Sequence, residues 1–187
     1  MKIKYPLLLR IFLALIVLSV MLVLVFFGSR SMLKSLYPVK YTEFVETYSK
    51  ENNLSDSFVY AVIKCESGFE SNVVSSVGAR GLMQIMPDTF SWIHGRLKDG
   101  AEYDDMFEPE KNIRYGCHLY GYLIEKYSSE ELAIAAYHAG PGNVDKWLLN
   151  EEYSEDGKSL SHIPFPSTRK YVTKVLETKK IYEKLYK

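Results

Sequence analysis

The sequence predicts a mostly α-helical globular domain preceded by one apolar N-terminal helix. Beyond residue 41, apolar side chains recur three or four positions apart, as they do along one face of an α-helix. No segment has the two-residue alternation that is typical of a half-buried strand. Before residue 41, the run IFLALIVLSVMLVLVFF contains a single polar side chain, Ser19, and predicts the N-terminal helix.

The composition is that of one soluble domain with an appendage. The chain has 187 residues, of which 47% are hydrophobic and 25% charged, so wholesale disorder and a many-span membrane protein are excluded. Lys+Arg and Asp+Glu both total 23. Six of the cations and none of the acids lie in the first 40 residues, which leaves residues 41–187 with a formal charge of −6. This balance argues against nucleic acid as a partner.

The N-terminal segment has the length of a membrane anchor. The apolar stretch at residues 7–27 reaches the roughly 20 residues that span a bilayer, with Arg10 near its end. The sequence GSRSMLKS that follows is a poor signal-peptidase site and has no cysteine for a lipid. These features favour an uncleaved anchor over a removed signal peptide. Because cations flank the segment on both sides, the positive-inside rule gives little help with its orientation.

We expect four parts in the chain, the first two overlapping. They are a cytoplasmic N-terminus at residues 1–10, a transmembrane anchor at 7–27, a linker at 28–40 and a globular domain at 41–187. The domain opens with a short helix whose apolar face holds Phe44, Val45 and Tyr48, and Ser55 offers a cap for the next helix. Later helices are expected at 57–65, 81–86, 88–94, 112–126, 130–137, 144–149 and 168–185.

Glu66 stands on the apolar stripe of the helix at 57–65, at a position where another aliphatic residue is expected. A carboxylate facing the core is costly when it is ionised, so the pKa of Glu66 should rise. A carboxyl group that keeps its proton near neutrality is what a general acid needs. The alternative is a frayed helix end that exposes Glu66 to water.

Two further clusters combine glycines with polar side chains. Ser75 precedes GARGLMQIMP, in which the amide of Gln84 interrupts an apolar stretch and could bind a sugar. The same stretch is compatible with a short core helix whose Gln84 is solvated. Tyr137 lies in AAYHAGPGNV, where a helix ends at a tight turn. Its phenol could serve a ligand, or it could be a core tyrosine beside a helix cap.

Taken in order and at this spacing, the clusters resemble the lytic transglycosylases of the soluble-lytic type, whose catalytic domain is related in fold to goose-type lysozyme. The resemblance covers roughly residues 41–185. The matching segments are ESGF at 66–69, GARGLMQIMP at 78–87, PE, NI and G at 109–116, AAY and GPGNV at 135–144, and PF, TR and YV at 164–172. The resemblance implies a lysozyme-like fold for the globular domain.

The resemblance also implies an activity. The family cleaves the β-1,4 bond between N-acetylmuramic acid and N-acetylglucosamine of peptidoglycan without water, leaving 1,6-anhydro ends. By motif, Glu66 would be the sole catalytic acid and base, and Ser75, Met83 and Gln84 would line the cleft. Tyr137 would hydrogen-bond or orient Glu66, and Tyr171 is a further tyrosine expected to face the cleft. No metal or organic cofactor is implied.

The expected partners are peptidoglycan glycan strands and, through the N-terminal helix, the membrane; the sequence indicates no particular protein partner. The expected location is the membrane, with the domain on the extracytoplasmic, cell-wall side.

Two residues depart from the family pattern. His138 stands where the family usually has asparagine, and its imidazole could tune the site or simply keep a neighbouring hydrogen bond. Ser167 stands where glutamate is usual, before Thr168 and Arg169, so substrate preference could differ.

The two cysteines leave two alternatives open. Cys65 precedes Glu66, and Cys117 lies in the helix expected at 112–126. A disulfide between them is compatible with an extracytoplasmic domain and would brace the base of Glu66. Two buried free thiols are the other alternative.

Two other functions remain open at this point. A hydrolase on the same scaffold, a muramidase or chitinase, would need a held water or a second carboxylate, for which Asp88, Asp104 and Asp105 are available. A non-catalytic glycan-binding protein of the cell envelope would not need the acid chemistry of Glu66.

Overall fold

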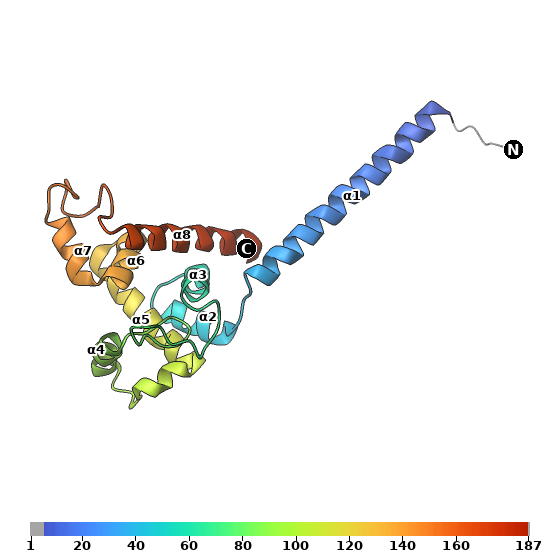
Figure 1. The fold of residues 1–187 in the computed structure, drawn as a ribbon. Coiled ribbons are helices and arrows are strands. Elements are labelled where there is room, and N and C mark those ends of the chain that lie inside the picture. The colour runs from blue at the N-terminus through green and yellow to red at the C-terminus, as the bar shows by residue number, and fades with distance from the viewer. Residues whose placement is uncertain (1–5, 187) are drawn as a thin grey trace. The chain divides into compact units, whose positions relative to one another are not determined.

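The structure is a computed structural model that describes residues 6–186 (Figure 1). The chain divides into two compact units, Met1–Pro38 and Val39–Lys187.

The first unit is a single long helix, α1 (Leu7–Leu36). Its 28-residue portion Leu9–Leu36 is long and apolar enough to cross a membrane. Ser19, the polar residue within the apolar run, donates its hydroxyl to the Ile16 carbonyl at 2.8 Å, so the group is satisfied within the helix. The helix continues to Leu36, through most of the residues expected to form a linker.

The second unit is helical, as predicted. Its elements are α2 (Thr42–Glu51), α3 (Asp56–Glu66), α4 (Pro87–Leu97), the 3₁₀ helix η1 (Tyr103–Phe107), α5 (Pro109–Tyr127), α6 (Glu130–Ala139), α7 (Pro141–Leu148) and α8 (Pro166–Tyr186). Proline occupies the first turn of α4, α5 and α7, where it lacks only an N–H that a helix start leaves unpaired. These prolines explain why the three helices begin earlier than the apolar spacing predicts.

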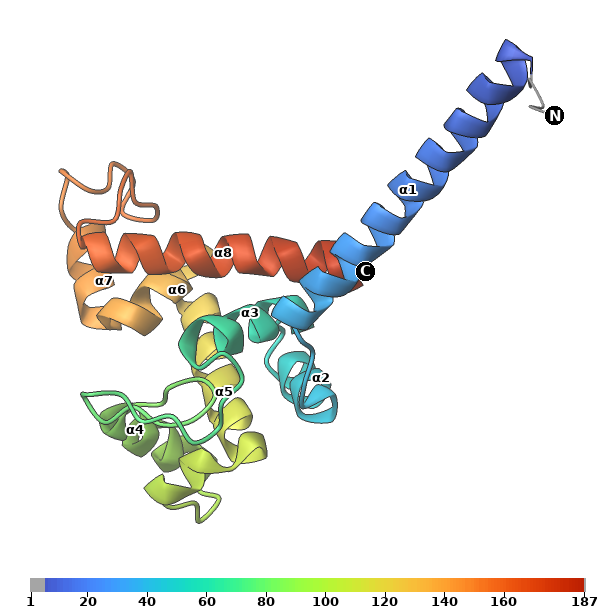
Figure 2. The same cartoon turned by 45° about the vertical axis from the view of Figure 1, so that its right-hand side comes forward.

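The core of this unit forms around α3 and α5. Six consecutive residues of α3, at positions 58–63, are buried. The helix α3 packs against α8 and α2, and α5 packs against α6, α2, η1 and α4. Figure 2 shows α8 lying across α6 and α3, so the C-terminal helix reaches the residues that end α3. This long-range contact places the candidate site.

The prediction of a helix at 81–86 is wrong. This segment belongs to a loop at 67–86 that contains isolated antiparallel bridges between Val74 and Arg80 and between Arg80 and Ile85. Gly81 has φ +76° and Gln84 has φ 51°, and these left-handed values interrupt the right-handed helix that the apolar spacing suggested.

Asn112 fixes this loop to the core. The side chain is fully buried on α5, and its Oδ1 accepts from the Met83 N–H at 2.7 Å. Its Nδ2 donates to the carbonyls of Arg80 at 2.9 Å and Met106 at 2.7 Å. A Cβ at Gly81 would come within 2.0 Å of the Met106 carbonyl oxygen, so only glycine fits beside the amide. One side chain therefore bonds two backbone groups of the loop and one of η1, which joins the loop to the helical core.

Cys65 and Cys117 are free thiols, so the disulfide alternative is not realised. The Cys65 thiol points to α8, where it donates to Thr178 Oγ1 at 3.6 Å. Cys117 is fully buried on α5, and burial raises the pKa of its thiol far above the usual range. The two cysteines make different contacts. The end of α3 that carries Glu66 is held by hydrogen bonds with α8 and not by a disulfide.

The Asn112→Ala substitution tests the role of this amide in stability. It removes the partners of the Met83 N–H and the Met106 carbonyl, while the Arg80 carbonyl still accepts from the Ile85 N–H at 3.0 Å, and we expect it to lower the free energy of unfolding by about 2–4 kcal/mol. The measurement is denaturant unfolding of the full chain in detergent micelles. Asn72→Ala, at an exposed asparagine of the same loop, is the control and should change stability by no more than about 0.5 kcal/mol. Equal losses in the two variants would contradict the assignment.

Candidate active site

Glu66 is the last residue of α3. The helix is fixed at its start by Ser55, whose hydroxyl accepts from the Phe58 N–H at 3.3 Å. It stops after Glu66 because Gly68 and Phe69 adopt left-handed φ angles of 61° and 73°. The Phe69 ring is 2% exposed and anchors this turn in the core. The carboxyl group is therefore presented at a rigid helix end.

The surroundings of Glu66 favour its protonated form. The residue is half-buried, and burial raises the pKa of its carboxyl group above the usual value. The Tyr171 hydroxyl donates to Glu66 Oε1, and this hydrogen bond lowers the pKa of the carboxyl group. The positive charge of Lys174 lowers it by a smaller amount, and the effect of burial remains larger than both. The pKa of Glu66 is therefore raised by burial, as the sequence predicts.

One face of α8 holds the end of α3. Tyr171, Lys174 and Thr178 are three and four residues apart, so they share that face. Tyr171 bonds Glu66, Lys174 Nζ donates to the Cys65 carbonyl at 3.1 Å, and Thr178 accepts from the Cys65 thiol. Lys174 thus satisfies a carbonyl of the last turn of α3, which has no intrahelical donor. These three contacts fix both the backbone and the side chain of the candidate acid.

Three buried or half-buried tyrosines form a connected cluster behind Glu66. The Tyr120 and Tyr171 hydroxyl oxygens are 3.5 Å apart. Because the Tyr171 hydroxyl donates its hydrogen bond to Glu66, Tyr120 is the donor in the bond between the two tyrosines. The Tyr120 ring stacks on Tyr137 at 4.2 Å and 7°. Burial raises the pKa of all three phenols well above the usual value, which keeps them neutral donors.

Tyr171, and not Tyr137, is hydrogen-bonded to Glu66, contrary to the expectation from the sequence. The Tyr137 hydroxyl donates to the Met83 carbonyl at 2.5 Å rather than to Glu66, while Tyr171 makes the bond to the carboxyl group. Tyr120 is not among the site residues expected from the sequence. Its position on the buried face of α5 is the available signal, because a hydroxyl on an apolar face needs a partner.

The three residues of the loop that were expected to line the cleft, Ser75, Met83 and Gln84, make contacts within the domain instead. Met83 is fully buried, and its sulfur packs where a Cβ at Gly116 would lie only 2.3 Å away, so Met83 lies in the core instead of lining a cleft. Ser75 Oγ accepts from the Ala79 N–H at 3.0 Å. Gln84 Nε2 donates to the carbonyls of Val73 and Gly81 at 3.2 and 2.9 Å. Both half-buried polar side chains brace the loop, and among the described residues neither is hydrogen-bonded to Glu66.

His138 lies beside the cluster, in the last turn of α6. Its Nδ1 is 3.0 Å from Thr168 Oγ1, and its ring packs on the Tyr171 ring with centroids 4.7 Å apart. Partial burial lowers the pKa of the imidazole below its usual value. The expected site residues Glu66, Tyr171 and His138 are therefore brought together.

An open cavity of about 330 Å³ adjoins Tyr137. Its walls come from α4, α5, and the junction of α6 with α7, where Gly140 has φ +86°. The aromatic and polar side chains among its lining are suited to stacking on and hydrogen-bonding to a sugar. They include Asp88, Thr89, Trp92, Tyr122, Tyr137 and Asp145.

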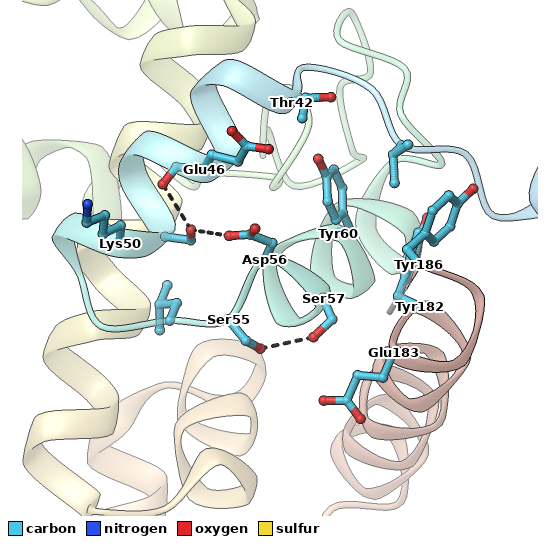
Figure 3. Close-up of a pocket in the computed structure, with 13 residues that line it drawn as sticks. Thr42, Glu46, Lys50, Ser55, Asp56, Ser57, Tyr60, Tyr182, Glu183 and Tyr186 are labelled. Carbon is cyan, nitrogen blue, oxygen red and sulfur yellow. Dashed lines mark hydrogen bonds between the residues drawn. The ribbon is translucent and has the colours of Figure 1, made fainter.

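A second cavity, of about 560 Å³, lies at the other end of α3 and α8 (Figure 3). Asp56, Tyr60 and Tyr182 are among its lining residues. Asp56 begins α3 and Glu66 ends it, so the rise of about 1.5 Å per residue separates them by roughly 15 Å. This cavity is therefore separate from the Glu66 site.

Within residues 6–186, no group of three or more His, Cys, Asp or Glu side chains is placed to hold a metal ion.

Fold and site together define a helical domain that presents the half-buried carboxyl group of Glu66 at the end of α3. The family described as Transglycosylase SLT domain matches residues 43–160, and the chain belongs to this family.

Two named relatives show how far this similarity extends. The chain is 35% identical to the soluble lytic murein transglycosylase of Salmonella typhimurium over 148 residues, which cover 77% of this chain and 23% of the relative. It is 27% identical to the membrane-bound lytic murein transglycosylase C of Edwardsiella ictaluri over 173 residues, which cover 78% and 47%.

Solved structures agree with this assignment. The soluble lytic transglycosylase Slt70 of Escherichia coli superimposes with a TM-score of 0.72 at 30% identity, over 81% of this chain and 25% of Slt70. The lytic transglycosylase Slt of Pseudomonas aeruginosa, an inactive mutant with glutamine in place of one glutamate, superimposes with a TM-score of 0.70 at 31% identity, over 82% and 25%. The chain thus spans about a quarter of the length of the soluble relatives it matches.

The Lys174→Gln substitution tests the electrostatics of Glu66. The ammonium group favours the carboxylate, so its removal should raise the pKa of Glu66 further. Carbon-13 NMR titration of the Glu66 carboxyl group in the full chain measures this shift. Lys180→Gln removes an equal charge from an exposed position about 9 Å further along α8 and should leave the titration unchanged. Equal shifts in both variants, or none in Lys174→Gln, would show that Lys174 does not act on Glu66.

Proposed function

We propose that this chain is a peptidoglycan lytic transglycosylase. It cleaves the β-1,4 bond between N-acetylmuramic acid and N-acetylglucosamine and leaves a 1,6-anhydromuramic end. The observation that carries the proposal is Glu66, a carboxyl group with a raised pKa that is bonded to Tyr171 in a domain of the SLT family. The names of the soluble and membrane-bound relatives support the substrate and the reaction.

Glu66 acts first as an acid and then as a base. Its proton passes to the glycosidic oxygen, the C1–O bond breaks, and N-acetylglucosamine leaves with a free hydroxyl group. The muramic C6 hydroxyl then attacks the oxocarbenium-like C1, and its proton returns to the Glu66 carboxylate. The hydrogen bond from Tyr171 strengthens as the carboxylate forms, so it stabilises the charge that develops in the transition state.

One carboxyl group is sufficient for this reaction. Glycosidases that use water commonly employ two, one as acid and one as nucleophile or base. Here the nucleophile is part of the substrate, so proximity replaces the activation of a water molecule. This argument does not require a metal or an organic cofactor.

A hydrolase is the second candidate, and of the three aspartates named for it only Asp88 has no ion pair among the described residues and lines a cavity. Asp104 pairs with Arg80, and Asp105 pairs with Lys111 at 2.8 Å, so both are engaged elsewhere. Asp88 lies at the start of α4 and lines the cavity beside Tyr137. A hydrolytic mechanism would have to use Asp88 or a water held by other groups opposite Glu66.

The cavity beside Tyr137, whose lining residues do not include Glu66, is proposed to bind sugars of the glycan strand away from the cleaved bond. Trp92 and Tyr122 offer aromatic surface for sugar rings, and the backbone at Gly140 permits close approach. The residues expected in direct contact with sugars therefore shift from Met83, which is buried, to the walls contributed by α4 and α5.

The proposed location is the membrane, with residues 1–10 in the cytoplasm, the anchor at 7–27 within α1 and the catalytic domain at 41–187 on the cell-wall side. The length and composition of α1 and the name of the membrane-bound relative support the anchor. The substrate supports the orientation, because peptidoglycan lies outside the membrane.

The Glu66→Gln substitution tests the role of the acid. Glutamine keeps the size of the side chain and cannot donate the acidic proton, so turnover of purified peptidoglycan should fall by about 10²–10⁴-fold. Binding to the same peptidoglycan in a sedimentation assay should persist. The exposed Glu70, four residues further on, provides the control Glu70→Gln, which should keep full turnover. Undiminished turnover in Glu66→Gln would refute the enzymatic role and favour a glycan-binding protein.

Protease treatment of spheroplasts tests the orientation. Cells that express the full chain should lose the domain at 41–187 to a protease that cannot cross the membrane. A cytoplasmic protein in the same cells should remain intact. A domain that is degraded only after lysis would place it in the cytoplasm and contradict the proposed location.

A further inference from the structure

His138 contacts two residues of α8 that share one helix face. Its Nδ1 lies 3.0 Å from Oγ1 of Thr168, and its ring packs on Tyr171 at 4.7 Å with an angle of 31° between the planes. Thr168 and Tyr171 are three residues apart, so one imidazole can touch both. Thr168 is 1% exposed in the first turn of α8 and provides a fixed anchor for the imidazole.

Tyr171 is supported at both ends of its side chain. Tyr120 lies 3.5 Å from its hydroxyl oxygen, and His138 packs on its ring. The hydroxyl group donates to Oε1 of Glu66, which leaves Oε2 as the oxygen that can carry the acid proton. Hydrogen bonds weaken steeply once their angle falls below about 120°, so a rotation of the Tyr171 ring that bends the bond this far would loosen its hold on the carboxyl group.

We propose that His138 is a positioning residue: anchored by Thr168, it holds the Tyr171 ring at the angle that keeps the hydroxyl group on Glu66 Oε1 and Oε2 free for the proton. The inference rests on the proposed function for its effect on turnover. Its effect on Glu66 itself is independent of that function.

The position of His138 allows it to be replaced with little effect on the core or on the charge of the site. The residue is solvent-exposed, so replacing it opens no cavity in the core. Partial desolvation by its neighbours lowers the pKa of the imidazole below its usual value, which favours the neutral form. The other titratable groups that interact with Glu66 are Tyr171 and Lys174 of α8, Tyr120 of α5, Tyr137 of α6 and Cys65 of α3, and the substitution removes none of them.

The test is a double-mutant cycle of His138→Leu and Tyr171→Phe in the full chain. Phenylalanine removes the hydroxyl group and keeps the ring, so any merely structural effect of His138 would persist in the Tyr171→Phe background. We expect His138→Leu alone to lower kcat about tenfold with KM within about twofold, and to lower kcat less than about twofold in that background. His138→Phe, which keeps an aromatic ring, should recover part of the loss.

A second readout does not depend on activity. Loss of the Tyr171 hydrogen bond should raise the pKa of Glu66, so His138→Leu should shift the carbon-13 titration of Glu66 upward, and it should add no shift to Tyr171→Phe. A raised KM, an effect that persists in the Tyr171→Phe background, or an unchanged titration of Glu66 would overturn the inference. An inactive wild-type protein whose Glu66 titration shifts as expected would refute the proposed function and leave the positioning role of His138 standing.

Discussion

A single carboxyl group, held partly out of water at the end of α3, is the constraint on which the other features of the site depend. Burial raises the pKa of Glu66, and the bond from Tyr171 limits that rise while it orients the group. Burial without a donor would favour the acid and leave the carboxylate unsupported after proton transfer. Full exposure would leave a carboxylate at neutral pH, which cannot act as an acid.

The fold supplies this environment through contacts between segments that are distant in sequence. The helix α8 brings Tyr171 and Lys174 to the end of α3, about a hundred residues away along the chain. Asn112 of α5 fixes the irregular loop that follows Glu66, and Tyr137 of α6 bonds the Met83 carbonyl in the same loop. The irregular loop at 67–86 is thus held by side chains from two regular helices.

Local sequence patterns predicted the helices and the unusual position of Glu66, because both follow from the spacing of apolar residues along one helix. The same reasoning failed for residues 81–86, where the left-handed backbone at Gly81 and Gln84 overrides an apolar run. The motif resemblance assigned the bond with Glu66 to Tyr137, whereas the structure gives it to Tyr171, because a motif does not show which of two tyrosines on different helices meets the carboxyl group.

The reaction assigned to Glu66 takes its nucleophile from the substrate, and digestion of peptidoglycan by the full chain in ¹⁸O-labelled water measures this most directly. The account predicts muramic acid ends that lack one water relative to hydrolysed ends and contain no ¹⁸O. Reducing muramic acid ends that carry ¹⁸O would contradict it and assign the site to a hydrolase.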